Sequence, residues 1–253
     1  MTAVAALLTL ADSRLPVGGH AHSGGVEQAI SDRFVTDAAT LADFLDRRLH
    51  TVAPVSAALA AAACHATAGH AIPAPTIPAP TIAGNAVTAH PIAAAYGPGD
   101  AGRLADRLAG LDAEADARMP APAVRAASRV LGRGLARLGR RAWPNPAWAE
   151  LPVAPHHPIA LGVAAASAGL SPVAAAQVAA YLSISGPASA AARLLSLDPL
   201  IVAGLTADLC TSIDAVAEQA SRDPAGPLNA VSDPWFDLLA ETHASRKDRL
   251  FAS

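Results

Sequence analysis

The sequence has little charge and few aromatic residues: Asp, Glu, Lys and Arg make up 15% of the chain, and Phe, Trp and Tyr 4%. Strands of sandwiches and barrels favour β-branched and aromatic side chains, so this scarcity disfavours an all-β fold. Hydrophobic residues make up 52% of the 253 positions, enough to build a sizeable core. Alanine, the commonest residue, also has the highest helix propensity. The composition therefore predicts an all-α fold.

An excess of basic charge is also missing. Lys and Arg number 18 against 21 Asp and Glu, which gives a formal net charge of −3. Proteins that bind phosphate backbones normally carry a basic excess, so we expect no nucleic-acid ligand. One arginine stripe has a spacing of four residues and so shares one helix face: Arg125, Arg129, Arg133 and Arg137. It indicates a solvated or acid-paired face, with a partner-docking face as the alternative.

Cysteine is scarce as well. Cys64 and Cys210 lie far apart, and neither belongs to a C-x-x-C pair. A disulfide framework or a zinc ribbon is therefore not indicated. Free thiols are the usual state in a reducing cytoplasm, and the N-terminal segment lacks the cationic region of a signal peptide. We expect a cytoplasmic protein.

A long stretch, residues 151–192, contains no Asp, Glu, Lys or Arg. A membrane span needs about 20 apolar residues in one unbroken helix. Here Gly169 followed by Ser171 and Pro172 gives a helix stop and then a helix start. The stretch therefore predicts two buried helices, at about 157–168 and 172–184, and no membrane association.

Helical patterns cover most of the remaining chain. Leu41, Phe44, Leu45 and Leu49 recur at helical spacing after Thr36, and Pro54 is expected to kink this helix. The other expected helices span about 3–11, 23–31, 100–117, 121–141, 187–220 (one helix, or two broken at 198–199) and 234–243. The sequence predicts a single-domain bundle over residues 1–253, with about eight to ten helices.

Residues 65–99 differ in character. Pro73-Ala74-Pro75-Thr76-Ile77 is repeated at once in residues 78–82, and proline at this density forbids helix and favours extended backbone. We expect a proline-rich insertion or loop here, within the helical domain.

Several catalytic patterns are absent from the sequence. It contains no G-x-x-x-x-G-K-[ST], no H-E-x-x-H and no G-x-S-x-G. The histidine pairs His20/His22 and His156/His157 lack the i, i+4 spacing of metal ligands on a helix face, and the second pair precedes Pro158 at an expected helix start. We predict no enzymatic activity, no catalytic residue, no metal site and no cofactor.

Both ends of the chain resemble one family. Residues 10–27, LADSRLPVGGHAHSGGVE, resemble the opening signature of UreF urease accessory proteins. Residues 243–253, HASRKDRLFAS, resemble that family's closing H-x(5)-R-L-F-x-S, and the helix beginning near Arg125 resembles its R-x-x-S-x-x-x-G segment. His20 and His22 stand where relatives often have aromatics. The resemblance spans nearly the whole chain except the insertion.

The resemblance implies a cytoplasmic, all-helical homodimer without catalysis. Such a protein bridges a UreH/UreD-type accessory protein and the GTPase UreG on the urease apoprotein, modulating the GTPase while nickel is inserted. Ser23 lies in the opening signature among the expected partner-binding residues. Glu27 and Arg193 match positions that face the GTPase, with an internal ion pair as the alternative. Arg249, Leu250 and Phe251 belong to a docking tail, 244–253, for the UreH/UreD-type partner.

Two other interpretations remain open at this point. The chain could be a helical scaffold unrelated to urease, or a helical enzyme that uses a histidine-bound metal. Residues alone also leave open whether the protein contacts nickel directly.

Overall fold

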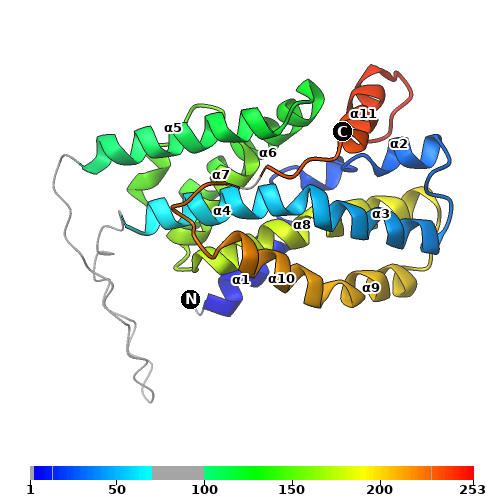
Figure 1. Cartoon of the computed structure of the whole chain (residues 1–253), viewed down its shortest axis with the longest axis horizontal. Coiled ribbons are helices and arrows are strands. Elements are labelled where there is room, and N and C mark those ends of the chain that lie inside the picture. The colour runs from blue at the N-terminus through cyan, green and yellow to red at the C-terminus, as the bar shows by residue number, and fades with distance from the viewer. Residues whose placement is uncertain (1–2, 13, 70–99, 229) are drawn as a thin grey trace, which may run out of the picture.

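The computed structural model describes residues 3–12, 14–69, 100–228 and 230–253. This part of the chain forms eleven α-helices and two short 3-10 helices, with no strand, which confirms the all-α prediction (Figure 1). The elements in chain order are α1 (Ala3–Ala11), η1 (Gly19–Ala21), α2 (Val26–Ser31), α3 (Ala38–Thr51), α4 (Ala53–Ala68), α5 (Asp100–Arg118), α6 (Pro122–Ala142), η2 (Pro146–Ala149), α7 (His157–Ser167), α8 (Pro172–Leu194), α9 (Pro199–Asp208), α10 (Cys210–Ala220) and α11 (Pro234–Ser245).

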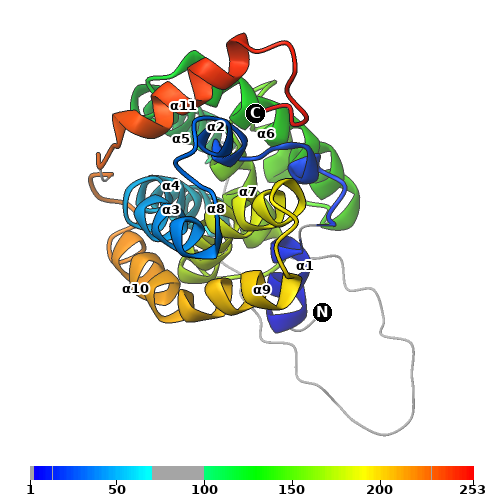
Figure 2. The same ribbon diagram turned by 90° about the vertical axis from the view of Figure 1, so that its right-hand side faces the viewer.

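Helix α4 lies at the centre of the bundle, packed against α7 and α8 (Figures 1 and 2). Twelve of its sixteen residues are buried, eight of them alanines. A helix buried on all sides has no polar face, and small side chains let its neighbours approach closely. Gly162 of α7 shows how closely: a Cβ there would lie 2.5 Å from the Ala60 carbonyl oxygen and 2.6 Å from Ala63 Cβ.

Bends and breaks between helices account for the number of helices being slightly higher than expected. Pro54 lies in the first turn of α4, and α3 and α4 meet at 43°, which agrees with the predicted kink. The segment expected at 187–220 contains two bends, because α8 ends at Leu194, Asp198 caps α9, and α9 meets α10 at 42°. Within the described ranges, no single helix has the length and hydropathy of a membrane span, although these two bent pairs reach it together.

Helix α8 is longer than the sequence predicted. The expected end near residue 184 is wrong, because α8 continues through Pro187 to Leu194. Proline has no N–H to donate to the carbonyl four residues earlier, that of Ser183. Arg48 Nε donates a hydrogen bond of 2.8 Å to this oxygen instead. A side chain from α3 therefore replaces the missing helical hydrogen bond.

The remaining differences concern helix boundaries. Helix α2 begins at Val26 and not near Ser23, because Gly24 and Gly25 adopt positive φ values of 61° and 91°. Asp37, one residue after the expected Thr36, caps α3 through a capping box with Thr40. Helix α4 continues to Ala68, so the first residues of the predicted insertion 65–99 are helical. Residues 70–99 lie outside the described part.

Candidate functional site: a cavity beside the C-terminal segment

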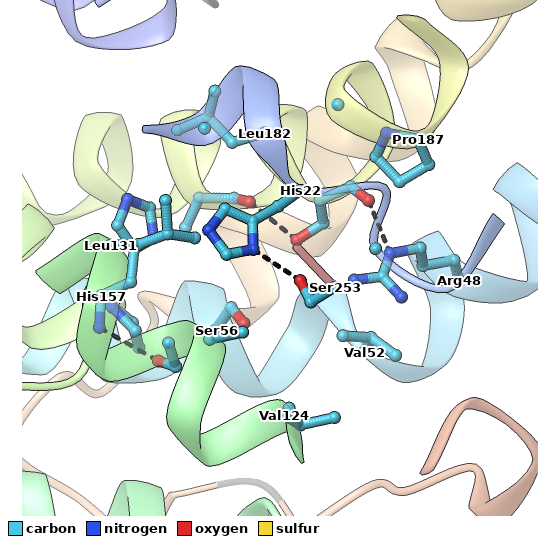
Figure 3. A pocket seen from close by; sticks show the side chains of 18 of the residues that line it. His22, Arg48, Val52, Ser56, Val124, Leu131, His157, Leu182, Pro187 and Ser253 are labelled. Carbon is cyan, nitrogen blue, oxygen red and sulfur yellow. Dashed lines mark hydrogen bonds between the residues drawn. The ribbon is translucent and has the colours of Figure 1, made fainter. Parts of the chain in front are cut away.

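A cavity of about 600 Å³ lies where the loop 18–25 meets helices α3, α6, α7 and α8 (Figure 3). Its size is within the range of small-molecule sites. The apolar part of its wall includes Val52, Val124, Leu131, Leu161 and Leu182. The polar part includes His22, Arg48, Ser56, His157, Ser185 and Ser253. The cavity therefore combines an apolar wall with many polar and charged groups, which also include Arg14, Arg118 and Arg193.

The C-terminal segment lies along the loop 18–25 and the start of α2, and contributes to this wall. The Ala252 N–H donates to the Ala21 carbonyl at 2.7 Å, and the Ser23 N–H donates to the Ser253 carbonyl at 2.5 Å. His22 Nδ1 lies 2.5 Å from Ser253 Oγ (Figure 3). The two sequence motifs at opposite ends of the chain thus form one structural unit.

Glu27 is the centre of this unit. Its carboxylate accepts hydrogen bonds from the Leu250 N–H at 2.7 Å, the Phe251 N–H at 3.0 Å and His243 Nε2 at 2.7 Å. Burial by itself would raise the pKa of Glu27, but these donors together hold the pKa below its ordinary value. The sequence left an internal ion pair as the alternative role for Glu27. The structure contains a pair of this kind, and the partner of Glu27 is His243.

The predicted partner-binding residues fall into two groups. Ser23, Glu27 and Phe251 are buried, whereas Arg193, Arg249 and Leu250 are exposed, Leu250 to 80%. Phe251, which the sequence places in the docking tail, packs against its own chain in this structure. Its ring is buried, with the Arg193 guanidinium 4.7 Å from the ring centroid. Arg193 also donates to the His20 carbonyl at 3.3 Å, and no carboxylate pairs with it in the described part.

Arg48 was not singled out in the sequence, and its position depends on the tertiary fold. Its guanidinium lies against Gly24, where a Cβ would be 3.3 Å from Nη2 and 2.9 Å from Pro187 Cγ. Burial lowers the pKa of Arg48 to about 10, so the group stays charged at neutral pH. The signal that could have identified it is Pro187 within a helical pattern, because the carbonyl it leaves free needs a donor from elsewhere.

Two histidines on the cavity wall, His22 and His157, have lowered pKa values and are therefore uncharged near neutral pH. Burial, and to a smaller extent His22, lowers the pKa of His157 to about 4. Burial, and then His20, lowers the pKa of His22. Neutral imidazoles can donate and accept hydrogen bonds, and can bind metal ions.

Another polar cluster lies between α5, α6 and the start of α7. One ligand atom from each of Asp112, Asp116 and His156 lies within 4.8 Å of the others, close enough to hold one metal ion. However, Arg129 already bonds both carboxylates, at 3.0 and 2.5 Å, and His156 Nε2 bonds Asp116 at 2.9 Å. A divalent cation would have to displace the guanidinium. We interpret the cluster as a structural connection between the helices.

This cluster also bears on whether the arginine stripe of α6 is a solvated or acid-paired face or a partner-docking face. Arg129 is acid-paired, whereas Arg133 and Arg137 are exposed on α6. His156, which precedes α7 at its N-cap position, is fully buried and bonds Ser128 Oγ at 3.0 Å. The predicted structural role of His156 at a helix start agrees with this geometry.

Comparisons with known proteins agree with the motifs. The sequence model of the UreF family matches residues 35–210. The urease accessory protein UreF of Mycobacterium sp. (strain JLS) is 44% identical over all 253 residues and the full length of both chains. The UreF proteins of Mycolicibacterium vanbaalenii and Mycobacterium tuberculosis (strain H37Rv) are 43% and 41% identical, again over both full lengths. The chain therefore belongs to the UreF family of urease accessory proteins.

Proposed function

We propose that this chain is a non-catalytic bridge in urease maturation. It joins a UreH/UreD-type accessory protein to the GTPase UreG on the urease apoprotein, in the cytoplasm, and modulates the GTPase while nickel is delivered as cargo. Family membership supports a role in urease maturation. The resemblance of the two terminal motifs supports the assignment of these partners, and it also implies a homodimer.

The observation that carries the proposal is the presentation of Leu250. This side chain is 80% exposed, although its own N–H and that of Phe251 are held by the buried carboxylate of Glu27. The cations Lys247 and Arg249 precede it in sequence, three residues and one residue earlier, and are exposed. An apolar side chain on an ordered backbone loses little entropy on binding, and nearby cations suit a partner groove with an acidic rim.

Within this proposal, Ser23, Glu27 and Phe251 act on partners indirectly. Their side chains are buried, so they hold the C-terminal segment in its binding conformation, while Arg249 and Leu250 contact the UreH/UreD-type partner. Arg193 is exposed on α8, next to the same segment, and faces the GTPase. The adjacency of the two sets would let one partner affect the binding of the other.

Leu250→Asp tests the docking role. Size-exclusion chromatography of the variant with the UreH/UreD-type partner should show loss of co-elution, with an unchanged circular dichroism spectrum. Val153→Asp is the matched control, because Val153 is 97% exposed in a different loop and should co-elute normally. Normal co-elution of the Leu250 variant would refute the docking role.

A further inference from the structure

We propose that the cavity binds a small organic anion, with the Arg48 guanidinium holding its carboxylate and the apolar wall holding its hydrocarbon body. Arg193, assigned above to the GTPase-facing surface, also lines this cavity, but Arg48 and the apolar wall are not among the residues assigned to protein partners, and anion binding does not depend on which partners bind there.

The guanidinium of Arg48 has N–H donors that are not used in hydrogen bonds within the described part of the chain. Its Nε–H is used by the Ser183 carbonyl, at 2.8 Å. In the part of the chain that the structure describes, Nη1 and Nη2 have no hydrogen-bond acceptor, and no carboxylate lies within 4.0 Å of the guanidinium. The Phe236 ring, 5.3 Å away, offers a cation–π contact. A half-buried charge without a counterion is only partly solvated, so this fork is poised to receive an anion.

The acidic side chains on the cavity wall bond groups other than Arg48. Asp233 receives two hydrogen bonds from Arg47, at 2.6 and 2.9 Å, and Asp12 is paired with Arg14. Asp237 accepts a backbone hydrogen bond from Ala121, and burial raises its pKa. These carboxylates are therefore not available to neutralise Arg48 without breaking other bonds.

A second polar group on the wall of the same cavity also lacks a hydrogen-bond partner in the described part of the chain. The hydroxyl of Ser185, one helical turn before Ser189 on α8, is buried and has no hydrogen-bond partner among the residues that the structure describes. A hydroxyl can donate to a carboxylate oxygen, and the neutral imidazoles of His22 and His157 can do the same. Unpaired polar groups of this kind indicate that a ligand completes the site.

The class of anion follows from the wall. A planar guanidinium fork matches the two oxygens of a carboxylate. Val52, Leu131 and Leu182 face the same space and would leave a fully hydrated ion, such as phosphate, with no partners on that side (Figure 3). A monocarboxylate with a short aliphatic chain satisfies both halves of the cavity. Hexanoate is a suitable probe, with acetate and inorganic phosphate as the comparisons.

The test must separate anion binding from the structural bond to Ser183. Pro187→Ala restores a helical N–H for the Ser183 carbonyl and so removes the need for Arg48 there. We would compare Pro187→Ala with the double variant Pro187→Ala/Arg48→Met by isothermal titration calorimetry and by thermal unfolding. Arg133→Met, an exposed arginine on α6, controls for the loss of one charge.

The expected result is that hexanoate binds the unaltered protein, Pro187→Ala and Arg133→Met alike and raises their melting temperatures. Acetate should bind more weakly, phosphate more weakly still, and the double variant should lose at least about tenfold in hexanoate affinity, which is 1.4 kcal/mol. Equal hexanoate affinity in the double variant would overturn the role of Arg48. Absence of binding to the unaltered protein, or tighter binding of phosphate than hexanoate, would overturn the proposed ligand class.

Discussion

The central helices and the C-terminal segment are held in place by different physical means. Where α4 meets α7 and α8, nearly every side chain is apolar and small, and backbones approach until a single added methyl group has no room. Where residues 250–253 meet the loop 18–25 and Glu27, a few directional hydrogen bonds to one carboxylate and two backbone carbonyls make the contact.

The difference shows how the two regions respond to change. Close packing of apolar groups is insensitive to charge and hard to open in part, because interiors are as dense as organic crystals. A contact made of a few directional hydrogen bonds to one carboxylate and to backbone groups can open locally at a lower cost than the core, even though that carboxylate is buried. The core therefore supplies stability, and the C-terminal contact supplies a surface that can be rearranged.

The largest expected effect comes from Gly162→Val in the core. The new Cβ would meet the Ala60 carbonyl oxygen and the Cys64 nitrogen, and backbone atoms cannot move aside cheaply. Overpacking of this kind costs about 3 kcal/mol or more, measurable as a lower urea midpoint. Gly110→Ala in α5 is the control, because no atom of the described residues lies within 4 Å of its Cβ position. It should stabilise the protein by about 0.5–1 kcal/mol.

The next effect concerns Glu27→Ala, which removes the acceptor for three donors. A buried donor left unsatisfied costs about 1–3 kcal/mol, but the C-terminal segment can swing into water, so we expect a total near 2 kcal/mol. Hydrogen exchange at Leu250 and Phe251 should accelerate, while α4 and α7 keep their protection. Glu218→Ala, at an exposed site on α10, should change neither. Equal loss of protection in α4 would show that the two regions are not separable.

The stability of the central helices and that of the C-terminal contact should depend on pH in different ways. The unfolded chain protonates His157 near pH 6.5, whereas burial keeps it neutral in the folded protein down to about pH 4. Stability should therefore fall as the pH is lowered through this interval, by at most about 1.4 kcal/mol per pH unit. His157→Asn should flatten the slope in a series of urea titrations.

The C-terminal contact should respond to pH in a lower range than His157 does. Because the pKa of Glu27 is held below its ordinary value of 4.5, its contribution is present above that pH and is lost only as the pH falls through the lower folded value. At pH 5, exchange at Leu250 and Phe251 relative to global unfolding should thus match that at pH 7. Selective opening of the C-terminal segment at pH 5 would contradict this assignment.

The smallest expected effect is that of Arg193→Ala on stability. The guanidinium lies over Phe251 and near the His20 carbonyl, and its removal leaves no carboxylate unpaired in the described part of the chain. An exposed cation–π contact contributes about 0.5–1 kcal/mol. We predict a small change in melting temperature together with weaker coupling to the GTPase, measured as GTP hydrolysis in the assembled complex. A large drop in melting temperature would instead assign Arg193 to the fold.

Local patterns in the sequence determined much of the fold. Alanine content and 3.6-residue spacing predicted an all-α bundle. Pro172 marked a helix start and Pro54 marked a kink, and the structure contains both. These signals act within a few residues, through φ restriction and capping, so they can be interpreted without knowing the rest of the fold. The motifs at the two ends also identified the family before any helix was placed.

What only the tertiary structure decided is which distant groups meet. The sequence showed Glu27 and the motif at 249–251 as separate features, but not that a carboxylate in one would bind the backbone of the other 223 residues away. The sequence likewise predicted a helix end near residue 184. The donor that lets α8 continue past Pro187 is Arg48, which lies 135 residues before its acceptor Ser183. Hydrogen bonds of this kind depend on the packing of whole helices, and such packing has no signature in the residues around either partner.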